Sequence, residues 1–393
     1  MNILFINDIP FNPKYGGIER VTDVLTKQLI DSYGHKIYYL SFQDREELDY
    51  VYPAKLYVLP RSSGLEDQKR YLLDIIDRHY IDVVVNQRGQ FKSICDIIPR
   101  QKTKVVNVIH SQPTAWIKMR LLLLYNYTPQ TISLKIRYAI KVLLYPLVYC
   151  YWKHKESKNF SSHYRFILNN YDALVLLSDK YRDELIRLTG SKIPLSKIIG
   201  IPNPNTFEGA NCEWSSKEKV ILYVGRLDKI EKAPLRLIKI WKRLYRKYPD
   251  WRLVLVGGGE YMSHMSEYVN RKSIDRVYFE GRQSNVAPYY EKASFICLTS
   301  NYEGWGMVLT EGMQYGCIPF TFNNYGAASD IIDDDVSGCL ISPFNYNEYA
   351  RRLSKLMDDD VLREKMSLET QKKVKEFDAN KISMMWDELF RSL

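Results

Sequence analysis

Short runs of consecutive apolar residues alternate along the chain with longer segments in which apolar residues recur every three or four positions. The first pattern predicts strands covered on both faces, and the second predicts amphipathic helices packed against them. Helices are expected over 17–33, where Gly34 supplies a stop, over 234–248, over 307–315 and from Tyr346 onward. The expected strands are NILFIN, KIYYLSF, DVVVN, KVVNVIH and DALVLLS in the first half, and VILYVG, WRLVLVG, VYFEG and SFICLTS in the second. This alternation indicates an α/β protein with a parallel, doubly wound sheet, and it occurs twice.

The two halves are separated by a polar stretch that begins with IPNP and is typical of a linker near residues 202–218. A chain of 393 residues is also too long for one ordinary domain. We therefore expect a Rossmann-like domain over 1–203, a second Rossmann-like domain over 204–377, and a terminal helix over 378–393 that packs back on the first domain.

The charge of the chain is concentrated in one segment. The formal net charge is +10, which points to nucleic acid, an anionic membrane or a phosphorylated small molecule as partner. Residues 114–165 hold one acid, Glu156, and nine bases: Lys118, Arg120, Lys135, Arg137, Lys141, Lys153, Lys155, Lys158 and Arg165. Leucine, tyrosine and tryptophan side chains lie between these bases, which favours an amphipathic segment on anionic lipid. The alternative is a pair of core-facing helices with a solvated basic side. Nucleic-acid binding is not expected, because no recognition fold accompanies the charge.

The cysteines and the apolar stretches indicate the cellular compartment of the protein. The six cysteines form no C-x-x-C pair, so they are interpreted as reduced thiols of a cytosolic protein. The apolar run at 3–6 is too short for a signal peptide, and the uncharged stretches 121–134 and 142–152 are shorter than the roughly 18 residues of a membrane-spanning helix. We therefore expect a cytoplasmic protein without a transmembrane segment.

The string SNYEGWGMVLTEGMQYG at 300–316 is the most informative motif, because it follows a predicted strand and opens a predicted helix. Glycines at such a turn let backbone amides approach a phosphate. If Glu303 and Glu311 both lay on the helix, they would be ~12 Å apart, which is too far for the carboxylate pair of a glycosidase. We therefore expect them to bind hydroxyl groups of one extended ligand. The alternative is a helix-start acid at 303 and a solvated side chain at 311.

Three further loops follow predicted strands. In YVGRLDKIEKAP, Arg226 and Lys232 combine a planar fork with a mobile point charge, which suits a diphosphate, although two ordinary surface bases are the alternative. The glycines at 257–259 are a weaker signal, because they lack the G-x-G-x-x-G spacing. In the first half, NDIPFNPKYGGIERVT places two glycines between strand and helix, and His110 follows its strand as either a crevice or a structural side chain.

Together these strings resemble the retaining glycosyltransferases of family 4, whose GT-B fold has two Rossmann-like domains facing across a cleft. The resemblance is carried by Gly16-Gly17 with Glu19, His110, IPNP at 201–204, Arg226 with Lys232, Gly257 to Gly259, EGWGMVLTE at 303–311 and YGAASDIIDDDVSGCLISP at 325–343. Ala233, where the family usually has Gly, and Trp305, where Phe is common, depart from it and bear on loop geometry.

The resemblance implies roles for residues of the second domain. Glu311 would bind the ribose of a nucleotide-sugar, and Glu303 would contact hydroxyls of the donor sugar. Arg226 and Lys232 would neutralise the diphosphate leaving group. Further donor contacts would come from Gly257, Gly258 and the backbone around Trp305, Gly306 and Met307.

In the first domain, the resemblance implies that Gly16 and Gly17 approach the donor phosphates and the acceptor, and that His110 lines the sugar pocket. It implies no metal and no cofactor other than the nucleotide-diphosphate sugar, with UDP favoured over GDP. The residues at 333–335 are interpreted as a solvated turn. Retention of configuration follows from the family, and without an obvious protein nucleophile we expect front-face displacement.

The implied activity is transfer of a hexose-type sugar to a glycan or lipid-linked acceptor, in lipopolysaccharide, capsule or glycolipid synthesis on the inner face of the membrane. One alternative is a nucleotide-sugar epimerase of the same fold, which would need no acceptor surface. The other is a non-catalytic sugar-nucleotide binding protein.

Overall fold

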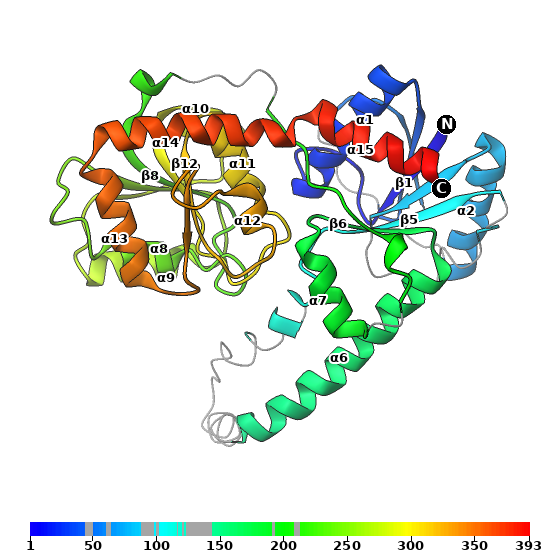
Figure 1. The fold of residues 1–393 in the computed structure, drawn as a ribbon, viewed down its shortest axis with the longest axis horizontal. Coiled ribbons are helices and arrows are strands. Elements are labelled where there is room, and N and C mark those ends of the chain that lie inside the picture. The colour runs from blue at the N-terminus through cyan, green and yellow to red at the C-terminus, as the bar shows by residue number, and fades with distance from the viewer. Residues whose placement is uncertain are drawn as a thin grey trace. The chain divides into compact units, whose positions relative to one another are not determined.

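The chain folds into two compact units, each built around one parallel sheet (Figure 1). The computed structural model describes residues 1–43, 50–59, 64–87, 98–99, 102–115, 117–119, 122, 144–190, 193–207 and 213–393. Unit 1 comprises Met1–Ile201 and Met384–Leu393, and unit 2 comprises Pro202–Ser383. The sequence-based boundary between 203 and 204 lies two residues from this division.

The described part of unit 1 contains a seven-stranded parallel sheet in the order β3-β2-β1-β4-β5-β6-β7. Its elements are β1 (Asn2–Asn7), α1 (Gly17–Tyr33), β2 (Lys36–Ser41), β3 (Lys55–Val58), α2 (Leu65–His79), β4 (Val83–Asn86), β5 (Lys104–Ile109), α6 (Tyr145–Asn170), β6 (Ala173–Leu176), α7 (Lys180–Thr189), the 3-10 turn Leu195–Lys197 and β7 (Ile198–Gly200).

Burial explains why consecutive apolar residues form the central strands of unit 1. The side chains of Ile3, Leu4 and Phe5 are fully buried, as are those of the three valines of β4. Both faces of these strands are therefore covered, as expected for a doubly wound sheet. The five strands predicted in this half are confirmed, and so is the helix over 17–33, which ends at Gly34 in the left-handed conformation with φ 64°.

Unit 2 contains, among the described residues, a six-stranded parallel sheet in the order β10-β9-β8-β11-β12-β13. Its elements are the 3-10 turn Trp214–Ser216, β8 (Glu218–Val224), α8 (Leu235–Trp241), β9 (Arg252–Val256), α9 (Met262–Arg271), β10 (Val277–Gly281), α10 (Ala287–Lys292), β11 (Ala293–Cys297), α11 (Met307–Gln314), β12 (Ile318–Phe322), α12 (Ala328–Ile331), β13 (Cys339–Ile341), α13 (Tyr346–Met357), α14 (Asp360–Lys373) and the 3-10 turn Val374–Phe377. The last helix, α15 (Ala379–Ser392), begins in unit 2 and ends in unit 1.

The four strands predicted in this half are confirmed, and β12 and β13 are additional. The predicted helix over 234–248 is too long, because α8 ends at Trp241 and the chain continues in turns. In these turns some backbone amides bond to the carbonyl three residues back instead of four, which interrupts the regular helix. The amide of Leu244, for example, donates to the carbonyl of Trp241 at 2.8 Å.

The end of α15 is attached to the rest of unit 1 by a buried hydrogen bond. His35, which follows α1, lies 2.8 Å from the carboxylate of Asp387 through Nε2. Asp387 also accepts a hydrogen bond of 2.7 Å from Arg391. Residues 384–393 therefore complete the surface of unit 1, although they are distant from it in sequence.

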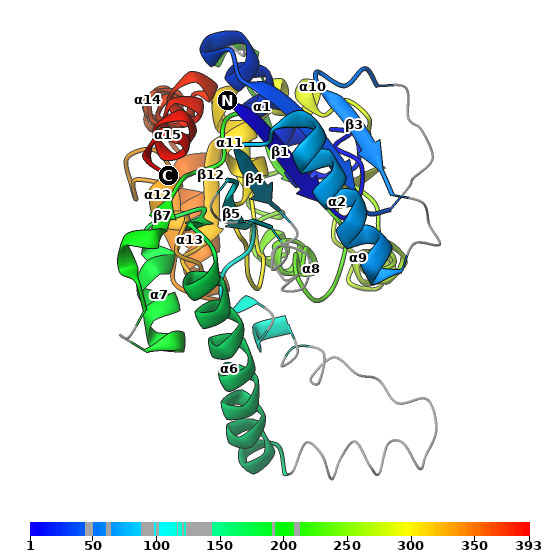
Figure 2. The same cartoon turned by 90° about the vertical axis from the view of Figure 1, so that its right-hand side faces the viewer.

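The longest of the described helices, α6, is mostly exposed in its first half, where Glu156 is buried, and packs against unit 1 along its second half. Tyr164, Ile167 and Leu168 pack into unit 1, whereas the helix start extends away from the sheet, as the two views in Figure 1 and Figure 2 agree. None of the helices among the described residues combines the length and the apolar character that a membrane span requires.

Candidate functional site

The strand order of unit 2 places two loops side by side. The order reverses between the neighbouring strands β8 and β11, and ligands of doubly wound sheets bind at the carboxyl ends of strands where such a reversal occurs. The loop after β8 carries Arg226 and Lys232, and the loop after β11 carries Glu303. The topology therefore brings these predicted residues together from positions about 70 residues apart in sequence.

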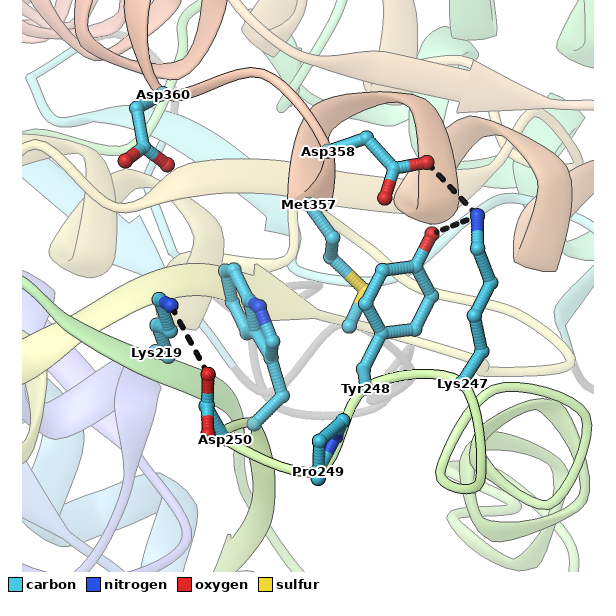
Figure 3. A pocket seen from close by; sticks show the side chains of 9 residues that line it. Lys219, Lys247, Tyr248, Pro249, Asp250, Met357, Asp358 and Asp360 are labelled. Atoms are coloured by element: carbon cyan, nitrogen blue, oxygen red, sulfur yellow. Dashed lines mark hydrogen bonds and ion pairs between the residues drawn. The ribbon is translucent and has the colours of Figure 1, made fainter.

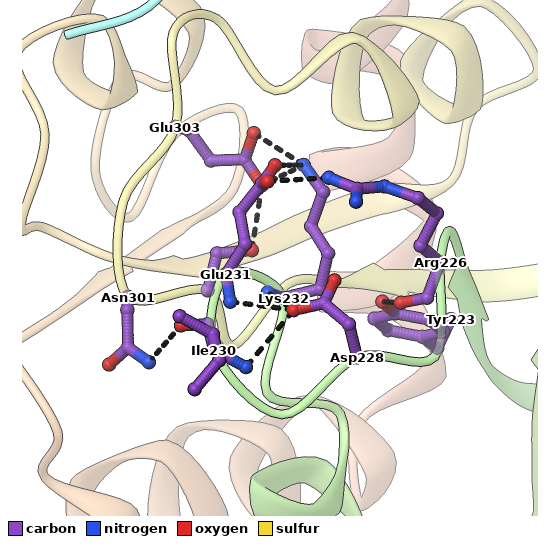
Figure 4. Close-up of polar contacts among 9 residues, drawn as sticks. Tyr223, Arg226, Asp228, Ile230, Glu231, Lys232, Asn301 and Glu303 are labelled. Atoms are coloured by element: carbon purple, nitrogen blue, oxygen red, sulfur yellow. Dashed lines mark hydrogen bonds and ion pairs between the residues drawn. The ribbon is translucent and has the colours of Figure 1, made fainter. Parts of the chain in front are cut away.

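Arg226, Glu231, Lys232 and Glu303, which we call the cation cluster, form a continuous chain of ion pairs (Figure 4). Lys232 Nζ lies 2.8 and 2.9 Å from the two carboxylate oxygens of Glu303. The same ammonium lies 3.0 Å from Oε1 of Glu231, whose Oε2 is 2.5 Å from Nη2 of Arg226. Two cations and two carboxylates thus share one site.

The side chain of Asp228, which the sequence did not indicate as a site residue, fixes the backbone of the loop after β8. Oδ1 of Asp228 accepts hydrogen bonds from the amides of Ile230 at 3.0 Å and Glu231 at 2.6 Å. The neighbouring loop completes the arrangement, because the amide of Asn301 donates to the carbonyl of Glu231 at 2.7 Å and its side chain donates to Ile230 at 2.6 Å. The cation cluster therefore rests on a turn that both loops hold in place.

Ala233 ends this loop in the left-handed conformation, with φ 45°. Its amide donates to the carbonyl of Asp228 at 3.0 Å, and its carbonyl accepts from the hydroxyl of Thr299 at 3.2 Å. These two bonds hold an alanine in a conformation that glycine adopts without steric strain. The departure from the family's usual glycine is accommodated by local hydrogen bonds.

The electrostatics of the cation cluster favour its charged form. Burial alone would lower the pKa of Lys232, but the charges of Glu303 and Glu231 outweigh it and raise this pKa above the usual range. Burial alone would raise the pKa of Glu231, and the neighbouring Lys232 and Arg226 instead lower it. The lysine is therefore an ammonium and Glu231 a carboxylate at neutral pH.

Glu303 and Glu311 are both buried, with exposed fractions of 6% and 3%, so the alternative of a helix-start acid and a solvated residue is wrong. Glu303 lies in the loop before α11, not on the helix, and also accepts from the hydroxyl of Ser300 at 2.6 Å. The separation of ~12 Å assumed for two helical positions therefore does not apply. The two carboxylates differ instead in their hydrogen-bond partners.

Glu311 lies inside α11 and accepts hydroxyl groups. Tyr290 donates to Oε2 at 2.8 Å and Thr206, from the linker, donates to Oε1 at 3.2 Å. This carboxylate is therefore placed to recognise hydroxyl donors. Its chemistry suits a sugar hydroxyl better than a phosphate.

The start of α11 has the geometry expected for close backbone approach. Gly306 precedes the helix with φ 92°, and a Cβ there would lie 3.0 Å from the hydroxyl of Tyr325. Met307 is the first helical residue, so its amide is among those that a helix leaves without an intrahelical partner. The side chain of Trp305 packs edge-on against Phe377, with ring centroids 5.0 Å apart, so only its backbone is placed at the turn.

The glycines after β9 serve loop packing. A Cβ on Gly257 would lie 1.9 Å from the carbonyl oxygen of Gly225, and one on Gly259 would lie 2.4 Å from that of Leu227. Gly258 has open surroundings, with the nearest atom, Cβ of Arg282, at 3.8 Å. Gly257 and Gly259 therefore allow the loop after β9 to lie directly on the loop that carries Arg226.

In unit 1, Gly16 and Gly17 lie at the start of α1, after the strand β1 at which the strand order reverses. Gly16 is extended, and a Cβ on it would lie 2.7 Å from Oε2 of Glu19. That carboxylate accepts a hydrogen bond of 2.9 Å from Asn7 at the end of β1. The first glycine thus makes room for a buried carboxylate at the carboxyl edge of the sheet.

His110 directly follows β5, at the same edge. Burial lowers its pKa to about 4, so the imidazole is neutral at pH 7. Its Nε2 is enclosed without a hydrogen-bond partner among the described residues, and the same holds for Nδ2 of Asn107. The nitrogen of a neutral imidazole can donate or accept one hydrogen bond, depending on the tautomer, and the partners of Nε2 do not come from the described residues.

Part of the basic segment lies outside the described residues, including Arg120, Lys135, Arg137 and Lys141. Within the described part, Lys118 is tied to Gln112 at 2.8 Å and Arg165 bonds the carbonyl of Thr189. Lys153, Lys155 and Lys158 are exposed on α6, as are the rings of Tyr151 and Trp152, and the ammonium of Lys155 lies over the Trp152 ring.

Asp333, Asp334 and Asp335 are paired with bases. Arg352 lies 2.6 Å from Asp334 and 2.7 Å from Asp335, and Lys373 lies 3.3 Å from Asp333. Across the described residues, no group of three or more His, Cys, Asp or Glu side chains is arranged to hold a metal ion.

A pocket on unit 2 lies at the opposite edge of the sheet (Figure 3). It contains Lys219, at the amino end of β8, and Asp250, just before β9, with their charged groups 3.4 Å apart. Lys247 is likewise paired with Asp358 at 2.9 Å. Because its charges are paired and it is at the amino ends of the strands, we do not assign the donor site to it.

Comparison with known proteins agrees with the predicted resemblance. Residues 208–373 match the family described as "Glycosyl transferases group 1". An uncharacterised glycosyltransferase of Haemophilus influenzae is 31% identical over 212 residues, which cover 52% of this chain and 60% of the relative. A Campylobacter jejuni enzyme named as an N-acetylgalactosamine-N,N'-diacetylbacillosaminyl-diphospho-undecaprenol 4-alpha-N-acetylgalactosaminyltransferase is 30% identical over 237 residues, covering 56% of this chain and 64% of the relative. The chain thus spans less than two thirds of these relatives' length.

Solved structures confirm the fold over the whole chain. Anabaena HepE in complex with UDP-glucose superposes with a TM-score of 0.74 at 16% identity and covers 100% of both chains. The lipopolysaccharide outer core galactosyltransferase WaaB superposes with a TM-score of 0.72 at 16% identity, again over 100% of both chains. The prediction of a GT-B fold with two Rossmann-like units is therefore confirmed.

Proposed function

We propose that this chain, in which residues 208–373 form a group 1 glycosyltransferase domain, is a retaining hexosyltransferase that uses a nucleotide-diphosphate sugar. The observation that carries the proposal is the meeting of Arg226, Lys232 and Glu303 at the reversal of strand order in unit 2. Fixed cations at that position suit the negative charge that develops on a departing phosphate. The buried carboxylate of Glu303 suits hydroxyls of the transferred sugar.

In the proposed reaction, the bond between the anomeric carbon and the diphosphate oxygen breaks on the same face on which the acceptor oxygen attacks. The acceptor proton passes to the leaving phosphate, so no protein nucleophile is required. Glu311 is proposed to bind the ribose, because it already accepts hydroxyl groups from Tyr290 and Thr206. Gly16 and Gly17 are proposed to approach the donor phosphates and the acceptor, and His110 is proposed to line the sugar pocket.

UDP is the proposed nucleotide, and the acceptor is a hydroxyl of a growing glycan carried on a lipid. Support comes from relatives, since HepE was solved with UDP-glucose and the Campylobacter enzyme is named for an undecaprenol-linked acceptor. We propose a role in surface polysaccharide or glycolipid synthesis. We also expect turnover in EDTA, because Arg226 and Lys232 supply the positive charge at the diphosphate.

The test is to incubate the protein with UDP- and GDP-sugars in EDTA and to measure nucleotide release with and without an undecaprenyl-diphosphate-linked glycan. We expect release from a UDP-sugar that increases when acceptor is present, and a product with the donor's anomeric configuration. Formation of an epimer without transfer would favour the epimerase alternative. Absence of turnover with every donor, despite nucleotide binding, would favour the non-catalytic alternative.

We further propose that the start of α6 contacts an anionic membrane from the cytoplasmic side. Tyr151 is 64% and Trp152 is 39% exposed, and Nζ of Lys155 lies 5.4 Å from the centre of the Trp152 ring. Aromatic rings beside exposed lysines are typical of helices that lie at a lipid interface. This arrangement would bring the enzyme to a lipid-linked acceptor.

Flotation with liposomes checks the membrane proposal. The protein is expected to float with anionic vesicles at low salt and to remain behind with neutral phosphatidylcholine. The double variant Tyr151→Ser with Trp152→Ser should reduce the floated fraction about tenfold. The control Tyr80→Asn, which removes an even more exposed ring elsewhere in unit 1, should not reduce it. Equal flotation of all three proteins would contradict a role for α6.

A further inference from the structure

Glu231 is the member of the cation cluster for which the proposed reaction has no use. Its carboxylate lies between the two cations, 2.5 Å from Arg226 and 3.0 Å from Lys232. The two cations are also the groups to which the proposed function assigns the donor diphosphate. The carboxylate of Glu231 and the diphosphate of the ligand would thus bind the same two cations.

The contacts of Lys232 show that a phosphate and the protein carboxylates would compete for the same N–H donors. Three carboxylate oxygens, two from Glu303 and one from Glu231, lie within 3.0 Å of its ammonium group. An ammonium has three N–H donors, so these contacts match its full donor capacity. A phosphate oxygen that binds Lys232 must take the place of one of them.

Exposure distinguishes the two carboxylates. The side chain of Glu303 is 6% exposed, whereas that of Glu231 is 27% exposed and faces Arg226, which is 66% exposed. An ion pair that reaches solvent is weak and readily broken, whereas a buried pair is not. Glu231 is therefore the group that a diphosphate would displace.

The backbone of Glu231 keeps its side chain next to the cations after such a displacement. Its amide is bonded to Asp228 and its carbonyl to Asn301, so only the side-chain torsions are free to change. A carboxylate anchored in this way has a high effective concentration at the cations. It is positioned to return as soon as a diphosphate moves away.

We propose that Glu231 is an internal competitor of the diphosphate, which limits the affinity for the donor and promotes release of the nucleoside diphosphate product. The inference rests on the proposed function and adds a product-release role to it. Glu231 is a positioning residue in this scheme, because it acts through Arg226 and Lys232 and not on the sugar.

A purely structural role predicts the opposite sign. If Glu231 only holds Arg226 in a productive conformation, its removal leaves the guanidinium less ordered and weakens diphosphate binding. If Glu231 competes, its removal frees two cations and strengthens binding. The direction of the change in affinity therefore separates the two roles.

The experiment measures binding of UDP, GDP and UMP to wild type, Glu231→Gln and Glu267→Gln by calorimetry, together with steady-state kinetics. Glu231→Gln keeps the size and hydrogen-bonding capacity of the side chain and removes its charge. We expect it to bind UDP roughly five- to tenfold more tightly, in line with one unit charge removed from a partly exposed site. The gain should be smaller with UMP, which lacks the second phosphate, and both KM for the donor and kcat should fall.

Glu267→Gln is the matched control, because it removes the same charge from an exposed position on α9. It should leave UDP affinity unchanged, and melting temperatures should show that both variants are folded. UDP affinity that is equal or weaker in Glu231→Gln than in wild type, while wild type binds UDP or GDP, would overturn this inference alone. Failure of wild type to bind any nucleoside diphosphate would overturn the proposed function and this inference together.

Discussion

Replacing Lys232 by alanine is expected to lower kcat/KM by about 10²- to 10³-fold, the range observed when one preorganised donor to a developing negative charge is removed. The variant loses the cation that is proposed to neutralise the leaving phosphate. It also removes the ammonium group that lies 2.8 Å from the buried carboxylate of Glu303. Steady-state kinetics with the donor identified by the nucleotide-release assay would measure the effect.

Lys229→Ala is the control for the loss of a positive charge. Lys229 lies in the same loop with its side chain exposed, three residues before Lys232. Its removal should change kcat/KM less than about threefold, as expected for a screened surface charge. Similar losses in the two variants, or a Lys232→Ala enzyme that is folded and nearly fully active, would contradict the assigned site.

Replacing Gly257 by alanine is expected to destabilise unit 2 by about 3 kcal/mol, because the change combines a steric clash with an unfavourable backbone conformation. The added Cβ would lie 1.9 Å from the carbonyl oxygen of Gly225, and φ at this position is 141°. Relief requires the loop after β9 to move away from the loop that carries Arg226. Thermal and urea unfolding would report the loss.

Gly258→Ala is the control that shows whether the loss of stability comes from the clash at position 257 or from any glycine-to-alanine change in this loop. The nearest atom to a Cβ there is 3.8 Å away, which is ordinary van der Waals contact. We expect the free energy of unfolding of this variant to lie within about 0.5 kcal/mol of the wild-type value, as is usual for substitutions without a structural conflict. Equal stabilities for the two alanine variants would argue against close loop packing.

Much of the fold was predictable because apolar runs report burial directly. The runs that became β1, β4, β8 and β11 are apolar on consecutive positions, and the structure buries both of their faces. The strand β12 was missed because it contains Pro319, a residue depleted from central strands. β13 has three residues and β3 has four, which is too short for a pattern to be distinctive.

The candidate site was predictable only as far as residue type and loop position allow. Arg226, Lys232 and Glu303 were found because each follows a strand, and parallel strands end at one edge. Glu231 stood in the same string, but nothing in the sequence indicates that its carboxylate bridges both bases. The packing role of Gly257 was also not predictable, because its neighbour, Gly225, is more than 30 residues away in sequence.

The division of the chain between the two units has a consequence for the order of folding during synthesis. Most of unit 1 precedes unit 2 along the chain, yet unit 1 also requires residues 384–393, which include the Asp387 partner of His35. Domains generally fold as soon as their residues have emerged. Here unit 2 ends at Ser383, before residues 384–393 are made, so unit 1 begins first along the chain but is completed after unit 2.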